Sequence, residues 1–204
     1  MTATLVSTAR LLPCDADGRI RNLCNYSAHL TEVGPLTALA PAAEGRPGDL
    51  VAEIHTAGLR GRGGGWFPTA RKMHAVVESA AARNAMSRGR KPVVVANAMD
   101  YVLLSHAPHL VLDGVQAAAQ TIGATTAYIA VHRGSSIIAI LDQALTERRG
   151  REAVKIELVT PPARYVASEE TALSHWIGDG SATPVFGGRP FQRGIGGRPT
   201  LVQN

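Results

Sequence analysis

The stretch Pro92-Val93-Val94-Val95-Ala96 decides the fold of this chain, because it is a continuous apolar run of strand length. A strand with one face in solvent alternates apolar and polar residues, whereas an unbroken apolar run is typical of a parallel strand covered on both faces. The polar residue Asn97 ends the run. The stretch therefore predicts a buried strand of an α/β domain.

Helices and strands alternate on either side of this strand. Upstream, helices are predicted over 49–57 and over 69–86, with Asp49 and Thr69 as candidate N-caps. Downstream, the pattern predicts a helix over 108–122, a strand over 127–131, a helix over 136–149 and a strand over 154–159. Alternation at this spacing indicates right-handed βαβ crossovers and a mainly parallel sheet.

The two ends of the chain have weaker patterns. Residues 1–48 are interrupted repeatedly by proline and glycine and are predicted to form an irregular arm. A last helix is predicted from Ser168, its candidate N-cap, to about residue 177. The tail over 187–204 lacks periodicity and is expected to be a loop.

In parallel sheets, ligands bind beyond the carboxyl ends of the strands. This rule makes Asn97 and the segments 132–134 and 160–164 candidate ligand positions, and Tyr165, Glu169 and Glu170 follow directly. A purely structural role is also open for the two glutamates, because acids in the first turn of a helix interact favourably with its dipole.

A glycine-rich segment lies between the first two predicted helices: Leu59-Arg60-Gly61-Arg62-Gly63-Gly64-Gly65-Trp66-Phe67-Pro68-Thr69-Ala70-Arg71-Lys72. Glycine lets the backbone approach a ligand closely, and free N–H groups beside cations attract phosphate. The segment lacks the Gly-Lys-Ser/Thr of a Walker loop and has Trp66 where a Rossmann fingerprint needs glycine. It therefore indicates a different anion cradle, with a flexible surface loop or an Arg-Gly nucleic-acid segment as alternatives.

The composition sets broad limits. A length of 204 residues with 45% hydrophobic content suffices for one sizeable core, and the formal charge of +5 favours anionic ligands without selecting one. Cys14 and Cys24 are too few to hold an iron–sulfur cluster or a tetrahedral zinc ion, so free thiols and no metal are expected. No apolar stretch of membrane-spanning length and no signal pattern is present, which predicts a cytoplasmic protein.

Several motifs occur in the order found in one family. They are the glycine-rich segment, Asn97 at the end of an apolar strand, Pro108-His109-Leu110 with Asp113-Gly114, Tyr165 with Glu169-Glu170-Thr171-Ala172-Leu173, and Gly197-Arg198-Pro199-Thr200-Leu201-Val202-Gln203-Asn204. Over about residues 50–204 the chain resembles the FMN- and NADH-binding flavoprotein subunit of respiratory complex I and of related soluble NAD-dependent hydrogenases and formate dehydrogenases.

The resemblance implies a Rossmann-like three-layer α/β domain over 49–204 that holds FMN and accepts a hydride from NADH. The positions that match the family's loop around the FMN phosphate and the dinucleotide are Gly61, Arg62, Gly63, Gly64 and Lys72.

Other matched positions surround the flavin and nicotinamide rings. Phe67 matches a phenylalanine near the nicotinamide nucleotide, while Asn97 and Asn204 match asparagines at the flavin. Tyr165, Glu169 and Glu170 match the segment that lines both rings, which makes them the candidate catalytic residues.

The chain also departs from the family pattern. Gly65-Trp66 stands where Ala-Gly is usual, and Ser168 replaces a glycine beside the two glutamates. After Asn97 the family has an acidic stretch, whereas here the segment over 98–107 is several residues shorter and Asp100 is its only acid, expected to contact the cofactor.

The chain stops at Asn204, before the family's ubiquitin-like domain and the cysteine quartet that binds a [4Fe–4S] cluster. One hypothesis is an NADH-oxidising FMN module that passes electrons to an iron–sulfur or ferredoxin-like partner. A second is a non-catalytic nucleotide-binding or assembly subunit of the same fold. A third, nucleic-acid binding through the Arg-Gly loop, predicts steep salt dependence but has no recognisable RNA-binding motif to support it, so no nucleic-acid partner is expected.

Overall fold

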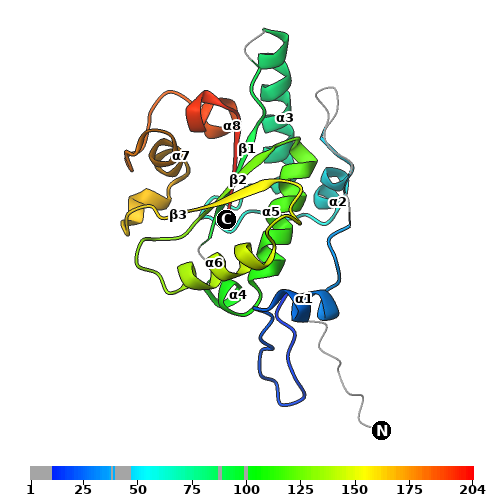
Figure 1. The fold of residues 1–204 in the computed structure, drawn as a ribbon. Coiled ribbons are helices and arrows are strands. Elements are labelled where there is room, and N and C mark those ends of the chain that lie inside the picture. Colours follow the sequence, from blue (N-terminus) through cyan, green and yellow to red (C-terminus); the bar gives the residue numbers. More distant parts are fainter. Residues whose placement is uncertain (1–10, 38, 40–46, 87–88, 99–100) are drawn as a thin grey trace.

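The part of the chain that the structure describes forms a four-stranded parallel sheet with helices on both faces (Figure 1). A computed structural model describes residues 11–37, 39, 47–86, 89–98 and 101–204. The strands are β1 (Val93–Asn97), β2 (Thr126–Ala130), β3 (Lys155–Val159) and β4 (Thr200–Gln203), in the spatial order β3-β2-β1-β4. Every strand pair is parallel, which confirms the predicted α/β class with a parallel sheet.

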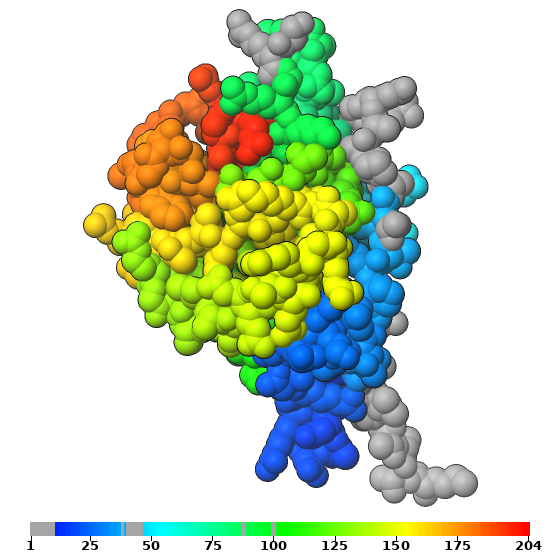
Figure 2. Space-filling model, in the orientation of Figure 1, coloured from blue at the N-terminus to red at the C-terminus, as the bar shows by residue number. Residues whose placement is uncertain are grey.

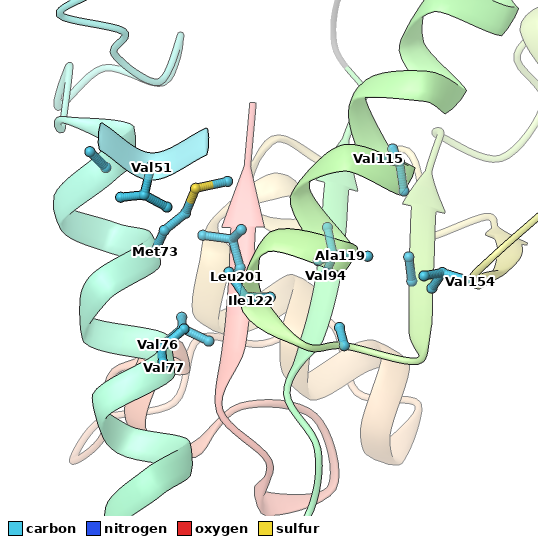
Figure 3. Packing of buried hydrophobic residues seen from close by; sticks show 13 residues of the cluster. Val51, Met73, Val76, Val77, Val94, Val115, Ala119, Ile122, Val154 and Leu201 are labelled. Carbon is cyan, nitrogen blue, oxygen red and sulfur yellow. The ribbon is translucent and has the colours of Figure 1, made fainter. Parts of the chain in front are cut away.

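One face of the sheet is covered by α2 (Leu50–Thr56), α3 (Thr69–Ala85) and α5 (Pro108–Ile122). Met73, Val76 and Val77 of α3 pack with Val94 of β1 and Leu201 of β4, as Figure 3 shows. The buried residues of α3 are spaced as the sequence predicted, because helical periodicity places them on one stripe.

The same face continues toward β3 under α4 (Tyr101–His106) and α6 (Ile137–Glu147). Leu104 of α4 and Leu141 of α6 pack against Ile129 of β2. The crossovers β1-α5-β2 and β2-α6-β3 run in the same direction along the sheet, so right-handed connections place both helices on one face. Helix α4 was not predicted, because a helix of six residues carries too little periodicity to be recognised.

The opposite face is covered by α7 (Glu170–Asp179) and the short 3₁₀ helix η2 (Ile195–Gly197). Leu173 of α7 and Ile195 of η2 pack against Val93, Val95 and Val202. Odd-numbered and even-numbered residues of β1 therefore face different helix layers, as a strand buried on both sides requires.

The expectation of a loop over 187–204 was wrong for part of the tail. This segment contains α8 (Pro190–Arg193), η2 and the edge strand β4, which pairs with β1 from Val93–Thr200 to Ala96–Gln203. A four-residue strand has no period that a sequence window can detect, and its pairing with β1 is long-range.

The described residues of the N-terminal segment contain one helix, α1 (Tyr26–Glu32), which begins with the Asn25 side chain as N-cap. Figure 2 shows this blue segment on the side of the molecule away from α8. It is joined to the domain by a buried polar cluster: His29 Nε2 lies 2.8 Å from Asp113 Oδ2, and Arg148 donates to Asp113 Oδ1 over 2.6 Å. His29 and His109 are fully buried, and their ring centroids lie 5.6 Å apart.

One predicted N-cap lies in place and one was wrong. Asp49 occupies the N-cap position of α2, but its side chain makes no capping bond, because its own backbone is already helical. Pro68 takes the N-cap position of α3, and Thr69 is the buried first residue of that helix. The Thr69 hydroxyl instead accepts a hydrogen bond from Gln203 Nε2 over 3.2 Å.

Candidate functional site

The order of the strands creates a switch point between β1 and β4. The chain runs from β1 through β2 to β3 in one direction and then returns to place β4 on the other side of β1. In open parallel sheets such a reversal leaves a crevice beyond the carboxyl ends of the two strands, where ligands bind. Asn97 ends β1, and Asn204 follows the last paired residue of β4, so both predicted asparagines lie at the sheet edge where this rule places a ligand.

The glycine-rich segment lies on the carboxyl end of β4. Its base is closed by hydrogen bonds from Gly61 N to Phe67 O over 3.0 Å and from Thr69 N to Leu59 O over 3.0 Å. A Cβ atom on Gly63 would lie only 2.4 Å from Asn204 Nδ2, so with glycine at this position the loop packs directly against the Asn204 side chain.

The tip of this loop presents free donors. In the part of the chain that the structure describes, the N–H groups of Gly63, Gly64 and Gly65 have no hydrogen-bond partner. The side chain of Arg62 is exposed beside them. Consecutive peptide N–H groups with a neighbouring cation form an anion-binding concavity, which fits the phosphate of a nucleotide.

Lys72 links three elements at the same edge. Its Nζ donates to Glu170 Oε2 over 3.1 Å and to the backbone oxygen of Val202 over 3.0 Å. Helix α3 is thereby tied to β4 and to the start of α7. Lys72 and Glu170 are only partly exposed, so the pair is held in place at the rim of the crevice.

The segment before α7 lies against the carboxyl end of β1. Residues Tyr165–Ser168 form the 3₁₀ helix η1, and Asn97 Nδ2 donates to Ser168 O over 2.8 Å. The side chain of Tyr165 is 98% exposed and lies outside the core. The structure thus brings Asn97 to η1 and leaves the Tyr165 ring in solvent.

Glu169 is the N-cap of α7, so the prediction of Ser168 in that role was wrong. Its carboxylate accepts hydrogen bonds from Thr171 N over 2.9 Å and from Ala172 N over 3.0 Å. Burial alone would raise the pKa of Glu169, but bonds from the Thr171 hydroxyl and from these amides outweigh burial and lower that pKa. Glu169 is therefore ionised at neutral pH and engaged with its own helix.

Two aromatic residues lie at the loop beside arginines. The Arg62 guanidinium carbon lies 5.9 Å from the Trp66 ring centroid, and that of Arg71 lies 5.7 Å from the Phe67 centroid. Both rings are exposed, Trp66 by 58% and Phe67 by 44%. The loop thus presents aromatic faces as well as positive charge at the crevice.

Most predicted site residues converge on this crevice, and Gln203 is an addition that the sequence did not reveal. Asp100 lies outside the described residues, so its predicted contact stays a prediction. Gln203 could be found only by predicting β4, since its side chain reaches Thr69 from the end of that strand.

Neither a membrane span nor a metal centre is found in the described part of the chain. None of its helices is long and apolar enough to cross a membrane. The described residues also contain no group of three or more His, Cys, Asp and Glu side chains that could hold a metal ion.

A parallel α/β domain with a glycine loop at its switch point is an architecture that many nucleotide-binding proteins share. The model of the Nuo51 FMN-binding domain matches residues 54–204, and the chain belongs to this family.

The relatives are longer proteins. The chain is similar to the F subunit of NADH-quinone oxidoreductase from Aquifex aeolicus, at 28% identity over 188 residues that cover 84% of this chain and 43% of the relative. Similarity to one of the F subunits of the Rhizobium meliloti NADH-quinone oxidoreductases is 26% over 204 residues, covering 91% of this chain and 48% of the relative. The chain therefore spans less than half the length of these curated relatives.

One solved structure is similar to this chain in fold as well as in sequence. A chain of an NAD⁺-reducing [NiFe]-hydrogenase in the H₂-reduced state matches with a TM-score of 0.63 and 28% identity. The match covers 76% of this chain and 28% of that chain. Multisubunit NADH oxidoreductases and hydrogenases are thus the setting in which this family works.

Proposed function

We propose that this chain is an FMN-binding NADH dehydrogenase module that oxidises NADH and delivers electrons to an iron–sulfur or ferredoxin-like partner. One observation carries the proposal: the glycine loop, the ends of β1 and β4, and the start of α7 meet at the switch point. FMN, when bound, would supply an acceptor for a hydride and could release electrons singly. The family match and the named relatives support this ligand.

The chain's own residues would bind and orient the ligands. The free N–H group of Gly63, beside the end of β4, would donate to the FMN phosphate, and Arg62 would balance its charge. Asn97 and Asn204 would donate or accept at the flavin ring from the two strand ends, while Phe67 would face the nicotinamide nucleotide.

The predicted catalytic residues would act by position and charge. Glu169 and Glu170 would place negative charge beside the nicotinamide, which becomes positively charged as NADH is oxidised. Lys72 already holds Glu170 in one orientation, and the N-cap bonds hold Glu169. Tyr165 is free to reorient over a bound ring, since its side chain lies almost wholly in solvent.

The second candidate, a non-catalytic nucleotide-binding or assembly subunit, is favoured by one observation. Both glutamates make structural interactions, Glu169 with α7 and Glu170 with Lys72. Glutamates held by these interactions would be less available to contact a substrate. The fold and the glycine loop would still allow a nucleotide to bind.

A single titration series separates these two functions. FMN fluorescence would be followed as purified protein is added, and NADH would then be added without oxygen while visible flavin absorbance is recorded. Binding followed by bleaching is expected for the dehydrogenase module. Binding without bleaching would support the non-catalytic role, and failure to bind FMN would refute the dehydrogenase module and leave only the assembly role.

Lys72→Gln tests the site within this series. Loss of a charged hydrogen-bonding group is expected to weaken FMN binding about tenfold or more. Lys155→Gln is the matched control, because Lys155 is exposed on β3 and pairs only with Glu157 among the described residues. If both variants weaken FMN binding equally, the cause is the loss of one positive charge from the protein and not the loss of a contact in the site.

A further inference from the structure

Trp66 has an unusual backbone conformation. Its φ is +44°, and among the described residues it is the only non-glycine residue with positive φ. A side chain in this left-handed region meets the neighbouring carbonyl and is disfavoured, most of all for a bulky residue. Such strain persists where the surrounding structure holds it, and it concentrates at ligand-binding sites.

The fold gains little from a tryptophan at this position. The ring is 58% exposed and belongs to none of the hydrophobic clusters found among the described residues. The bonds that shape the turn use only its backbone: Trp66 N donates to Gly63 O over 3.1 Å, and Trp66 O accepts from Arg60 over 3.4 Å. Glycine could make both bonds without strain, so the indole itself needs another explanation.

The surroundings of the ring match the chemistry of a nucleotide. Arg62 lies over the indole, and the free N–H groups of Gly64 and Gly65 precede it in the same loop. An aromatic face next to cations and amide donors can bind a heteroaromatic ring together with the phosphate attached to it.

The position of the ring within the loop favours the dinucleotide over FMN. Gly61 and Gly63 contact the end of β4, where the proposed flavin site lies. In contrast, apart from the residues directly before and after each glycine, no atom of the described residues lies within 4 Å of a Cβ built on Gly64 or Gly65, so the part of the loop next to Trp66 is open. A second ligand that approaches from solvent would meet this open part first.

We propose that Trp66 is a specificity-determining residue that stacks on one heteroaromatic ring of the dinucleotide substrate. This inference rests on the proposed function, because it assumes that a dinucleotide binds beside FMN. It adds a contact and a selectivity that the glycine loop alone would not provide.

The test uses the full chain, saturated with FMN, and two halves of the dinucleotide as probes. ADP-ribose carries adenine without nicotinamide, and nicotinamide mononucleotide carries nicotinamide without adenine. Calorimetric titrations would compare the wild type with Trp66→Gly, Trp66→Leu and Trp66→Phe. The leucine variant keeps the strained, bulky residue and loses the aromatic face, whereas the phenylalanine variant keeps both.

Trp66→Gly and Trp66→Leu are expected to lower the affinity for one of the two halves about tenfold. The half that is affected identifies the ring that stacks on Trp66. Trp66→Phe is expected to stay within about threefold of the wild type, since its ring can still stack. FMN affinity should change less than about twofold in all three, and the melting temperature of Trp66→Gly should not fall, because glycine relieves the strain.

Two results would overturn the inference while leaving the proposed function intact. In the first, the glycine and leucine variants bind both halves of the dinucleotide with wild-type affinity. In the second, the glycine variant binds either half more tightly than the wild type, which would mean that the indole obstructs the site. A wild-type chain that binds neither FMN nor either half would refute the proposed function and this inference together.

Discussion

Gly63→Ala is the sharpest perturbation of the proposed flavin site. The new Cβ would lie 2.4 Å from Asn204 Nδ2, about 1 Å short of ordinary van der Waals contact. That atom is the end of an exposed, flexible side chain, so Asn204 can rotate away and the fold should lose less than about 1 kcal/mol. The same rotation would remove Asn204 from the flavin.

The expected loss of affinity follows from that displacement. A hydrogen bond that is lost from a binding site costs about 1–3 kcal/mol, so the FMN dissociation constant should rise by about fivefold to about 150-fold. Fluorescence titration of FMN measures this value, and thermal unfolding measures the stability of the same sample.

Gly65→Ala is the matched control for this variant. It adds the same methyl group two residues further along the loop, where no atom of the described residues lies within 4 Å and φ is not positive. Wild-type FMN affinity in Gly63→Ala would refute the reasoning, because the contact between the loop and Asn204 would then be irrelevant to the ligand. Equal losses in both variants would show that any methyl group in the loop disturbs binding.

Three further predictions concern groups whose partners the structure defines. Glu169→Ala should cost about 1 kcal/mol in urea unfolding at neutral pH, and because the folded-state pKa of Glu169 is lowered, this contribution should be lost as the pH falls from about 5 to 3. Asp113→Ala should cost about 3 kcal/mol by the same assay, because it leaves buried Arg148 without one of its acceptors; a cost below about 1 kcal/mol would contradict this estimate. Burial lowers the pKa of His109, so stability should fall as the pH drops below about 6.5, and His109→Gln should reduce that dependence in unfolding curves recorded between pH 7 and 5.

The sequence predicted the elements whose signals are local. The helix over 108–122 was predicted with the bounds that the structure shows, because Pro108 can begin a helix and Gly123 ends it with φ of +73°. The strands β1, β2 and β3 were predicted to within one residue at each end, since each lies between clear helical segments. The caps were less predictable, because Glu169 and Ser168 both have oxygen atoms that could cap and only the backbone geometry decides between them.

The sequence predicted which residues belong to the candidate site, but not how those residues are arranged in space. Its assembly depends on β4 lying beside β1, and strand order is a long-range property without a local sequence signal. Once β4 is in place, Asn204 reaches the glycine loop and Lys72 reaches the backbone of Val202. The resemblance therefore named these positions together, whereas their mutual contacts needed the structure, and their roles toward a ligand stay a prediction.

The motifs that identify the family also divide by physical role. Asn97, the glycine loop and Asn204 lie at the switch point, but His109 and Asp113 are buried under α1, where they join the N-terminal segment to α5 and α6. His109 Nε2 lies 2.9 Å from Cys24 O, and Leu23 N donates to His106 O at the end of α4, the helix that follows Asn97 in the chain. Substitutions in this buried group should therefore change stability first, and ligand affinity only through α4. A match to a family motif is thus no evidence that each of its residues touches the ligand.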